Sequence, residues 1–341
     1  VPAALAVAEE RGRSGRDLLA AVALGVEACC RVGLAVHPWH YDEGWHITGT
    51  VGVFGAAAAA GKLLGLDTAQ MVACLGTAGT QAAGVREVFG SMGKPFHPGR
   101  SAQSGVLAAL LAARGFTSTP QILEGRRGFC AVYSGQHDLA QATAGLGERW
   151  ELSNNGLKPY ACGVVNHPLI DAVVALRHED GVTPEAVEAI QARVHPLVLE
   201  LVDRRHPQVG LEGKFSVHHC LAVALVDGAA YPAQFTDARV RDPVVAALRE
   251  RVQLTRDERL REDEAVVRLV LRDGRAREHH VPHATGSPDN PMSDAQLEEK
   301  FRTLAGETLP RPQVERLLAQ LWRLDEVGDV ADVVPLLRPR R

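Results

Sequence analysis

The hydrophobic positions of the first 150 residues recur at helical spacing and are interrupted by glycine. Residues 15–32 carry apolar side chains in the pattern of a buried helix. Residues 50–64 predict a second helix, so rich in alanine and glycine that it must pack closely against neighbouring backbones. Asp67, with Gln70 three positions later, forms the capping box that predicts a third helix start. This part of the chain therefore predicts tightly crossed helices rather than a sheet.

Pro98 predicts the first turn of a further helix, which continues through residues 107–113. On this interpretation, the basic segment Lys94–Gly99 lies directly before that helix or at its first turn.

After Trp150 the pattern changes from helical spacing to a mixture of helices and alternating segments. Ile190, Ala192 and Val194 alternate with polar residues and predict a half-buried strand. A second alternating segment at 267–272, followed by Asp273-Gly274, predicts a hairpin. Helices are predicted at 167–181, 216–227, 297–306 and 314–324, and another begins after Asp242.

These elements predict an α plus α+β protein, with a large all-helical domain and a smaller inserted α+β domain. Residues 1–151 form the first part of the helical domain and residues 152–288 form the α+β domain. Residues 289–341 return to helices and are predicted to close the first domain.

Composition narrows the class of protein. The chain has 341 residues, 46% hydrophobic and 23% charged, with a formal net charge of −4. This balance is typical of a soluble globular protein and argues against a nucleic-acid binder, which needs a basic surface. An uncharged run of about 18 apolar residues does not occur, so the sequence predicts no membrane span. Its six cysteines show no metal-binding spacing and predict buried free thiols in a cytoplasmic protein.

The basic residues are strongly biased, since only five of the 37 are lysines. Where arginine is so favoured, a remaining lysine more often serves a role that needs a compact ammonium with a tunable pKa. Three of the five, Lys94, Lys158 and Lys214, occur in segments that also carry histidine or tyrosine.

The segment Gly44–Ala102 gives the first candidate chemistry. His46 and Thr48 lie in a glycine-rich turn before a predicted helix, where backbone donors and hydroxyls suit an anion. The alternative for His46 is a structural histidine in a loop. Lys94, His97 and Arg100 gather positive charge near a helix start, where the helix dipole disfavours it and a bound anion would offset it. The alternative is a solvated basic turn.

Two further segments are candidates. Lys158 and Tyr160 lie where the helical part gives way to the α+β part, and such boundaries are where clefts form. Lys214 and His218 precede or begin a helix, and the alternative is simply the start of an amphipathic helix.

A metal site is not predicted. The segment that holds His37, His40, Asp42 and Glu43 offers ligand types, but the spacing favours an exposed loop.

Several segments together resemble the MmgE/PrpD family, which includes 2-methylcitrate dehydratase and cis-aconitate decarboxylase. The matching segments, in the order of the family, are GWHITGTVGVFGAAAAAGKLLGL at 44–66, GSMGKPFHPGRSAQSG at 90–105, LKPYACGVVNHPLIDA at 157–172, GKFSVHHCLAVALVDG at 213–228 and GSPDNPMSDAQLEEKF at 286–301.

The resemblance implies a large helical domain with a smaller α+β lid, a homodimer, and an active site that needs no metal or organic cofactor. It also implies roles for individual residues. His46 matches the active-site histidine of the family's G-x-H-x-T-G motif, Lys94 the lysine of K-P-x-H-x-G, and Lys158 the lysine of K-P-Y. His218 stands where relatives often have tyrosine, and Gly163 where many have cysteine or histidine. Family members also usually carry an upstream segment with Asp and His, which this chain is expected to lack.

Taken together, the residues and the resemblance predict a lyase that acts on a small di- or tricarboxylate in the cytoplasm of a bacterium. The expected reaction is proton abstraction with dehydration, as in a hydro-lyase, or with decarboxylation. His46, Lys94 and Lys158 are predicted to be catalytic, and Thr48, His97, Arg100, Tyr160, Lys214 and His218 to bind substrate. The alternatives are an isomerase or epimerase of an amino-dicarboxylate derivative and a truncated, non-catalytic family member.

Overall fold

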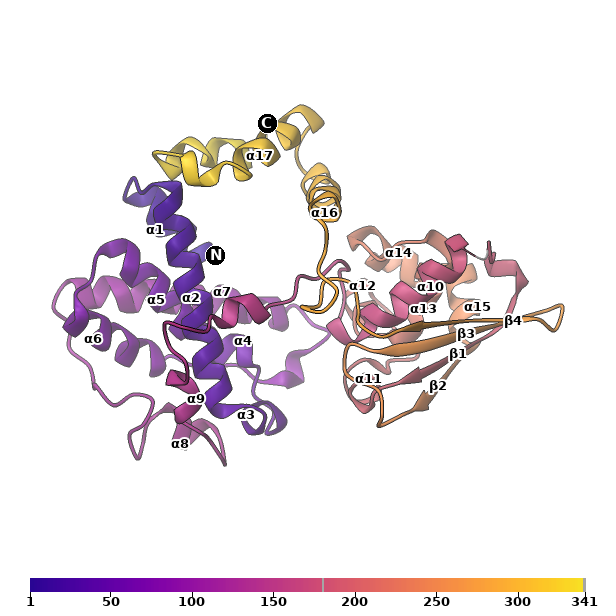
Figure 1. Ribbon diagram of the computed structural model, residues 1–341, viewed down its shortest axis with the longest axis horizontal. Coiled ribbons are helices and arrows are strands. Elements are labelled where there is room, and N and C mark those ends of the chain that lie inside the picture. The colour runs from indigo at the N-terminus through magenta and orange to yellow at the C-terminus, as the bar shows by residue number, and fades with distance from the viewer. Residues whose placement is uncertain (180, 340–341) are drawn as a thin grey trace. The chain divides into compact units, whose positions relative to one another are not determined.

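A computed structural model describes residues 1–179 and 181–339, and the chain forms two compact units (Figure 1). Unit 1 comprises Val1–Val88, Met92–Asn154 and the residues from Phe301 onward. Unit 2 comprises Phe89–Ser91 and Asn155–Lys300. That unit 2 acts as a lid stays a prediction.

Unit 1 is built from helices. They are α1 (Pro2–Glu10), α2 (Gly15–Val36), α3 (Trp39–Asp42), α4 (Ile47–Thr50), α5 (Gly52–Leu64), α6 (Thr68–Gly79), α7 (Gly93–Ala113), α8 (Phe129–Tyr133), α9 (Ala140–Thr143) and α17 (Arg311–Leu321). As predicted, Asp67 and Gln70 form the capping box of α6.

The small residues of α5 let it pack closely against its neighbours, as the sequence predicts. A Cβ at Gly25 of α2 would lie 2.7 Å from the carbonyl oxygen of Gly55 in α5, so the two backbones meet where both residues lack a side chain. On α7, a Cβ at Gly105 would lie 2.5 Å from the Ala57 nitrogen. Helix α5 is therefore the central helix of this core.

Two apolar segments of unit 1, Gly15–Val36 and Ile47–Leu64, are long and apolar enough to cross a membrane by length and composition alone. Both contribute to the core of unit 1. The first also carries a buried ion pair, in which Arg31 Nε lies 2.6 Å from Glu27 Oε1. The absence of a membrane span stays a prediction.

The start of α7 differs from the predicted one. The helix begins at Gly93 rather than at Pro98, so Lys94 and His97 lie in its first two turns. Pro95 is the third helical residue, where a backbone N–H has no helical acceptor and proline is tolerated. Pro98 is internal, and it has no N–H to donate to the Lys94 carbonyl four residues earlier.

Unit 2 combines helices with one four-stranded sheet. Its elements are α10 (His167–Glu179), α11 (Pro196–Val202), α12 (Gly210–Gly213), α13 (Val217–Asp227), α14 (Asp237–Val240), α15 (Pro243–Arg249), β1 (Val187–Val194), β2 (Val252–Arg256), β3 (Ala265–Leu271) and β4 (Ala276–Val281). Helix α16 (Asp294–Gly306) spans the division between the units.

The strand order is β2-β1-β3-β4, with β1 parallel to β2 and antiparallel to β3, and with β3 antiparallel to β4. The predicted hairpin at 267–272 is confirmed, and Gly274 supplies its positive φ of 84°. Helices α10 and α13 contribute buried apolar residues to the same core as the inward faces of β1 and β3. Strand β2 is not predicted by the sequence, because it is short and only Val252 in it is buried.

Candidate active site

The central feature of unit 1 is a contact between two histidine rings. His46 Nδ1 lies 2.7 Å from His97 Nδ1, and the ring centroids are 5.0 Å apart. His46 is buried and His97 is half-buried. The structure thus joins directly two residues predicted for the site that are 51 positions apart in the sequence.

A short antiparallel pairing holds His46. Its backbone N–H donates to the Gly84 carbonyl at 3.1 Å, and the Arg86 N–H donates to the Gly44 carbonyl at 2.8 Å. His46 is also the residue that precedes α4. The loop after α6 and the start of α4 therefore fix its backbone from two sides.

Helix α7 brings His97 to this place. The Ser101 hydroxyl, one turn after His97, donates to the Gly49 carbonyl at 2.7 Å. Two glycines leave room for the ring. A Cβ at Gly84 would lie 2.9 Å from His97 Nδ1, and one at Gly49 would lie 3.3 Å from His97 Cβ. Gly84 has a φ of 130°, which strongly favours glycine at this position.

The surroundings keep His46 uncharged. Burial, followed by the charges of Lys94 and His97, lowers the pKa of His46 to about 4. Lys94 is half-buried in the first turn of α7, near enough to act on His46 electrostatically. A carboxylate bound beside Lys94 would offset the charge of the ammonium group, and would therefore favour the protonated form of His46.

The contact between the two Nδ1 atoms couples the two tautomers. One Nδ1 must carry the hydrogen and the other must accept it. If both rings are neutral, the ring that donates at Nδ1 has its hydrogen-free nitrogen at Nε2. The ring that accepts at Nδ1 carries its N–H at Nε2. The neutral pair thus offers one base and one acid at its two Nε2 atoms.

For Thr48 and Arg100, the other residues predicted in unit 1, the structure describes different contacts. The Thr48 side chain is exposed, and it is the Thr48 carbonyl that accepts from Ser101. Arg100 is exposed and donates to Gln103 at 2.8 Å.

His40 corrects the prediction of an exposed loop. It is fully buried, with Nε2 lying 2.6 Å from the Thr50 hydroxyl and Nδ1 lying 2.7 Å from the Tyr133 carbonyl. The ring stacks on Trp45. Nothing local in the sequence signals this burial, because the partners of His40 come from α4 and α8.

In unit 2, Lys158 reaches the loop before α10. Its Nζ donates to the Cys162 carbonyl at 3.3 Å. Burial of the ammonium group lowers the pKa of Lys158, although much of the side chain is exposed.

Cys162 is a titratable group that the sequence did not single out. Burial opposes its ionisation, but hydrogen bonds with Cys220 and His167 outweigh burial and lower the pKa of Cys162 to about 6. His167 is buried as the first residue of α10. The sequence suggested only a helix start for it.

The remaining predicted residues of unit 2 are held by structural contacts. The Tyr160 hydroxyl donates to Asp171 Oδ1 at 2.6 Å, and its pKa is raised, first by burial and then by Asp171. His218 is buried, with Nε2 lying 2.6 Å from Asp203 Oδ1. Lys214 is half-buried, and its carbonyl accepts from the Gly163 N–H.

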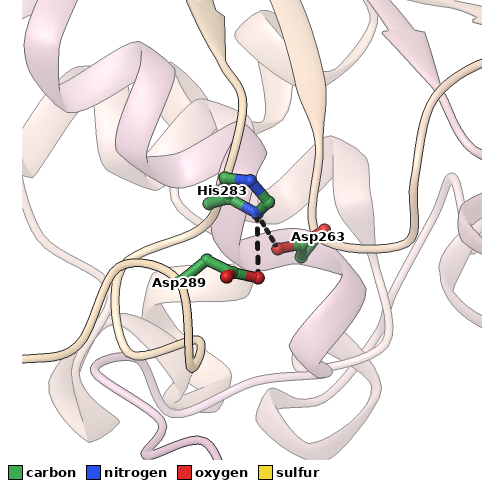
Figure 2. Close-up of side chains that lie close together, drawn as sticks. All are labelled: Asp263, His283 and Asp289. Carbon is green, nitrogen blue, oxygen red and sulfur yellow. Dashed lines mark hydrogen bonds and ion pairs between the residues drawn. The ribbon is translucent and has the colours of Figure 1, made fainter.

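One group of described residues has the ligand types and spacing for a metal ion. Asp263, His283 and Asp289 of unit 2 offer ligand atoms that all lie within 4.8 Å of one another (Figure 2). They are not among the residues predicted for the active site.

Comparison with known proteins gives two family matches that together cover most of the chain. The MmgE/PrpD N-terminal domain matches residues 1–142, and the MmgE/PrpD C-terminal domain matches residues 160–325. The chain is 29% identical over 370 residues to cis-aconitate decarboxylase of Aspergillus terreus, covering 99% of this chain and 74% of the relative. It is 27% identical over 353 residues to cis-aconitate decarboxylase of Homo sapiens, covering 99% of this chain and 73% of the relative.

Proposed function

The chain belongs to the MmgE/PrpD family, and from that premise we propose that it is a lyase that decarboxylates a small unsaturated tricarboxylate resembling cis-aconitate. The observation that carries the proposal is the His46–His97 pair beside Lys94. The names of the similar relatives favour this substrate over others.

The reaction needs one proton and one electron shift. The bond to the departing carboxylate breaks, and its electron pair forms a new carbon–carbon double bond as carbon dioxide leaves. The electrons of the original double bond take up a proton at its far carbon. A general acid must therefore deliver one proton per turnover to carbon.

The His46–His97 pair is suited to that delivery. His46 is neutral when the site is empty, and the negative charge of a tricarboxylate favours its protonated form. When His46 is protonated, a proton given up at Nε2 of His97 is replaced by the Nδ1 hydrogen of His46. Solvent then restores the pair, so the net reaction consumes one proton.

Lys94 is proposed to bind a substrate carboxylate and to offset the charge that develops as carbon dioxide leaves. That Lys158 of unit 2 is catalytic stays a prediction from the sequence. That Thr48 and Arg100 of unit 1, and Tyr160, Lys214 and His218 of unit 2, bind substrate stays a prediction from the sequence. That the enzyme is a cytoplasmic homodimer stays a prediction.

A hydro-lyase of the 2-methylcitrate dehydratase type is the second candidate, because the same pair could protonate a departing hydroxyl group. An isomerase or epimerase of an amino-dicarboxylate derivative would also abstract and return a proton, but it would release neither carbon dioxide nor water. A non-catalytic member would turn over none of these substrates. The products separate these possibilities.

The test is a steady-state assay of the purified chain on cis-aconitate, citrate and 2-methylcitrate, with carbon dioxide and new double bonds measured separately. We expect one carbon dioxide per cis-aconitate consumed. A new double bond from citrate or 2-methylcitrate without carbon dioxide would favour the hydro-lyase. Turnover of none of them, together with no rise in thermal stability on adding them, would refute both.

A further inference from the structure

We propose that Asp263, His283 and Asp289 form a site for a divalent transition-metal ion of the zinc class in unit 2. The three residues are not among those predicted for the active site, and the ion is proposed to stabilise the fold of unit 2. The proposal goes beyond the proposed function and does not depend on it.

The donor atoms converge from two loops. Figure 2 shows the His283 ring directed toward both carboxylates. His283 Nδ1 lies 2.8 Å from Asp263 Oδ2 and 3.6 Å from Asp289 Oδ2. Ligands bound to one zinc ion at about 2.0–2.2 Å stand roughly 3–3.6 Å apart, so small shifts of the side chains suffice to bind an ion. One imidazole with two carboxylates is a donor set that zinc accepts.

The backbone holds these side chains in place before any ion arrives. The Ala284 N–H donates to the Asp263 carbonyl at 2.8 Å, which joins the two loops next to the donor atoms. The loop that carries Asp289 closes on itself, because the Gly286 N–H donates to the Asn290 carbonyl at 2.7 Å. Asn290 Nδ2 then donates to the His283 carbonyl at 3.0 Å.

The cluster also opens onto a pocket of about 620 Å³ whose lining includes His283 and Asp289. This space leaves room for water to complete the coordination of an ion. His178 and His279 line the same pocket.

Arg261 is the competing cation. Its Nη2 lies 3.3 Å from His283 Nε2 and its Nε lies 3.7 Å from Asp263 Oδ1. Arg261 has other partners as well, since it also donates to the Pro282 carbonyl at 2.8 Å and pairs with Glu264 at 3.6 Å. A metal ion bound to His283 Nδ1 replaces the hydrogen on that nitrogen, so the neutral ring carries its N–H at Nε2. Because Nε2 can then no longer accept from Arg261, the contact with Arg261 is lost.

The experiment is calorimetric titration of the full chain with Zn²⁺ and, separately, with Mg²⁺. We expect one Zn²⁺ per chain, bound at least about tenfold more tightly than Mg²⁺, because imidazole favours the softer ion. His283→Ala and Asp289→Asn should each weaken Zn²⁺ binding by about tenfold or more. Asp289 is exposed, so its substitution leaves the fold intact.

Two further variants make the test specific. His206→Ala is the matched control, because His206 forms a similar but exposed pair with Glu250 at 3.3 Å outside the pocket, and it should bind Zn²⁺ as the wild type does. Arg261→Gln should tighten Zn²⁺ binding by roughly tenfold, since it removes a nearby positive charge. Equal binding by the wild type and His283→Ala, or no binding by the wild type, would overturn the proposal.

Discussion

Among the individual side chains, His97 is the one whose role depends most on its partner. We expect His97→Asn to keep a donor near the place of Nδ1, because an asparagine amide can donate to His46 Nδ1. An amide cannot pass on a proton, so kcat on cis-aconitate should fall by about 10²- to 10⁴-fold with little change in KM. Steady-state kinetics measures both constants.

His137→Asn is the control for that substitution, since His137 is an exposed histidine of the same unit. A wild-type kcat for His97→Asn would show that the proton does not pass between the two rings. A raised KM with an unchanged kcat would show instead that His97 only binds substrate.

Gly84 is the residue that makes room for His97. Gly84→Ala should lower the free energy of unfolding by about 1–2 kcal/mol, because its φ of 130° disfavours a side chain. The new Cβ would also lie 2.9 Å from His97 Nδ1 and displace the ring, so activity should fall as well. Chemical denaturation and kinetics on the same preparation measure the two effects.

Gly115→Ala separates these two causes. Gly115 also has a positive φ, of 83°, but a Cβ there would meet nothing within 4 Å. This variant should lose stability and retain activity. If both variants lost activity equally, the loss would come from general destabilisation and not from the His97 ring.

At the level of helices, Pro98 limits the stability of the start of α7. Pro98→Ala restores an N–H that can donate to the Lys94 carbonyl and should raise the free energy of unfolding by about 1–3 kcal/mol. Pro95→Ala is the matched control, because the third helical residue has no helical acceptor for its N–H. It should be neutral or destabilise by up to about 1 kcal/mol, since only the unfolded chain gains freedom. Urea denaturation that found Pro98→Ala less stable than the wild type would contradict this account.

Elements specified by neighbouring residues were predictable from the sequence. The capping box of α6 and the Asp273-Gly274 hairpin depend on contacts between residues a few positions apart, and both are confirmed. The start of α7 was misplaced, because proline at either 95 or 98 satisfies local rules. The choice between them comes from packing, including the bond from Ser101 to the Gly49 carbonyl.

The sequence indicated which residues belong to the candidate site, but it could not predict how their side chains are arranged. His46, Lys94 and His97 stood out by type and by family motif. The contact between His46 and His97 depends on how α7 packs on α4, and it also needs the absence of a side chain at Gly84. Local sequence rules do not report such long-range contacts, and they missed the burial of His40 for the same reason.

For the molecule as a whole, buried histidines make stability depend on pH. Burial lowers the pKa of His46 and of His219 to about 4, and it is also the first cause of the lowered pKa of His40 and of His218. In the unfolded chain these groups titrate near pH 6.5. Between about pH 6.5 and 4 the unfolded state therefore binds more protons than the native state, so the free energy of unfolding falls as the pH falls.

The size of this effect can be measured and assigned to residues. His46 and His219 should each contribute on the order of 3 kcal/mol to the free energy of unfolding. This contribution is present in full above pH 6.5 and is lost as the pH falls to 4. Urea denaturation at several pH values gives the slope of the free energy of unfolding against pH, and this slope should be smaller for His219→Gln than for the wild type. The glutamine amide can still donate to the Gln234 carbonyl, which His219 Nε2 contacts at 2.8 Å. His206→Gln, at an exposed position, should leave the slope unchanged. A wild-type slope for His219→Gln would mean that the His219 imidazole has the same pKa in the folded and unfolded states. The sensitivity of the folded protein to acid would then come from other groups, such as carboxylates.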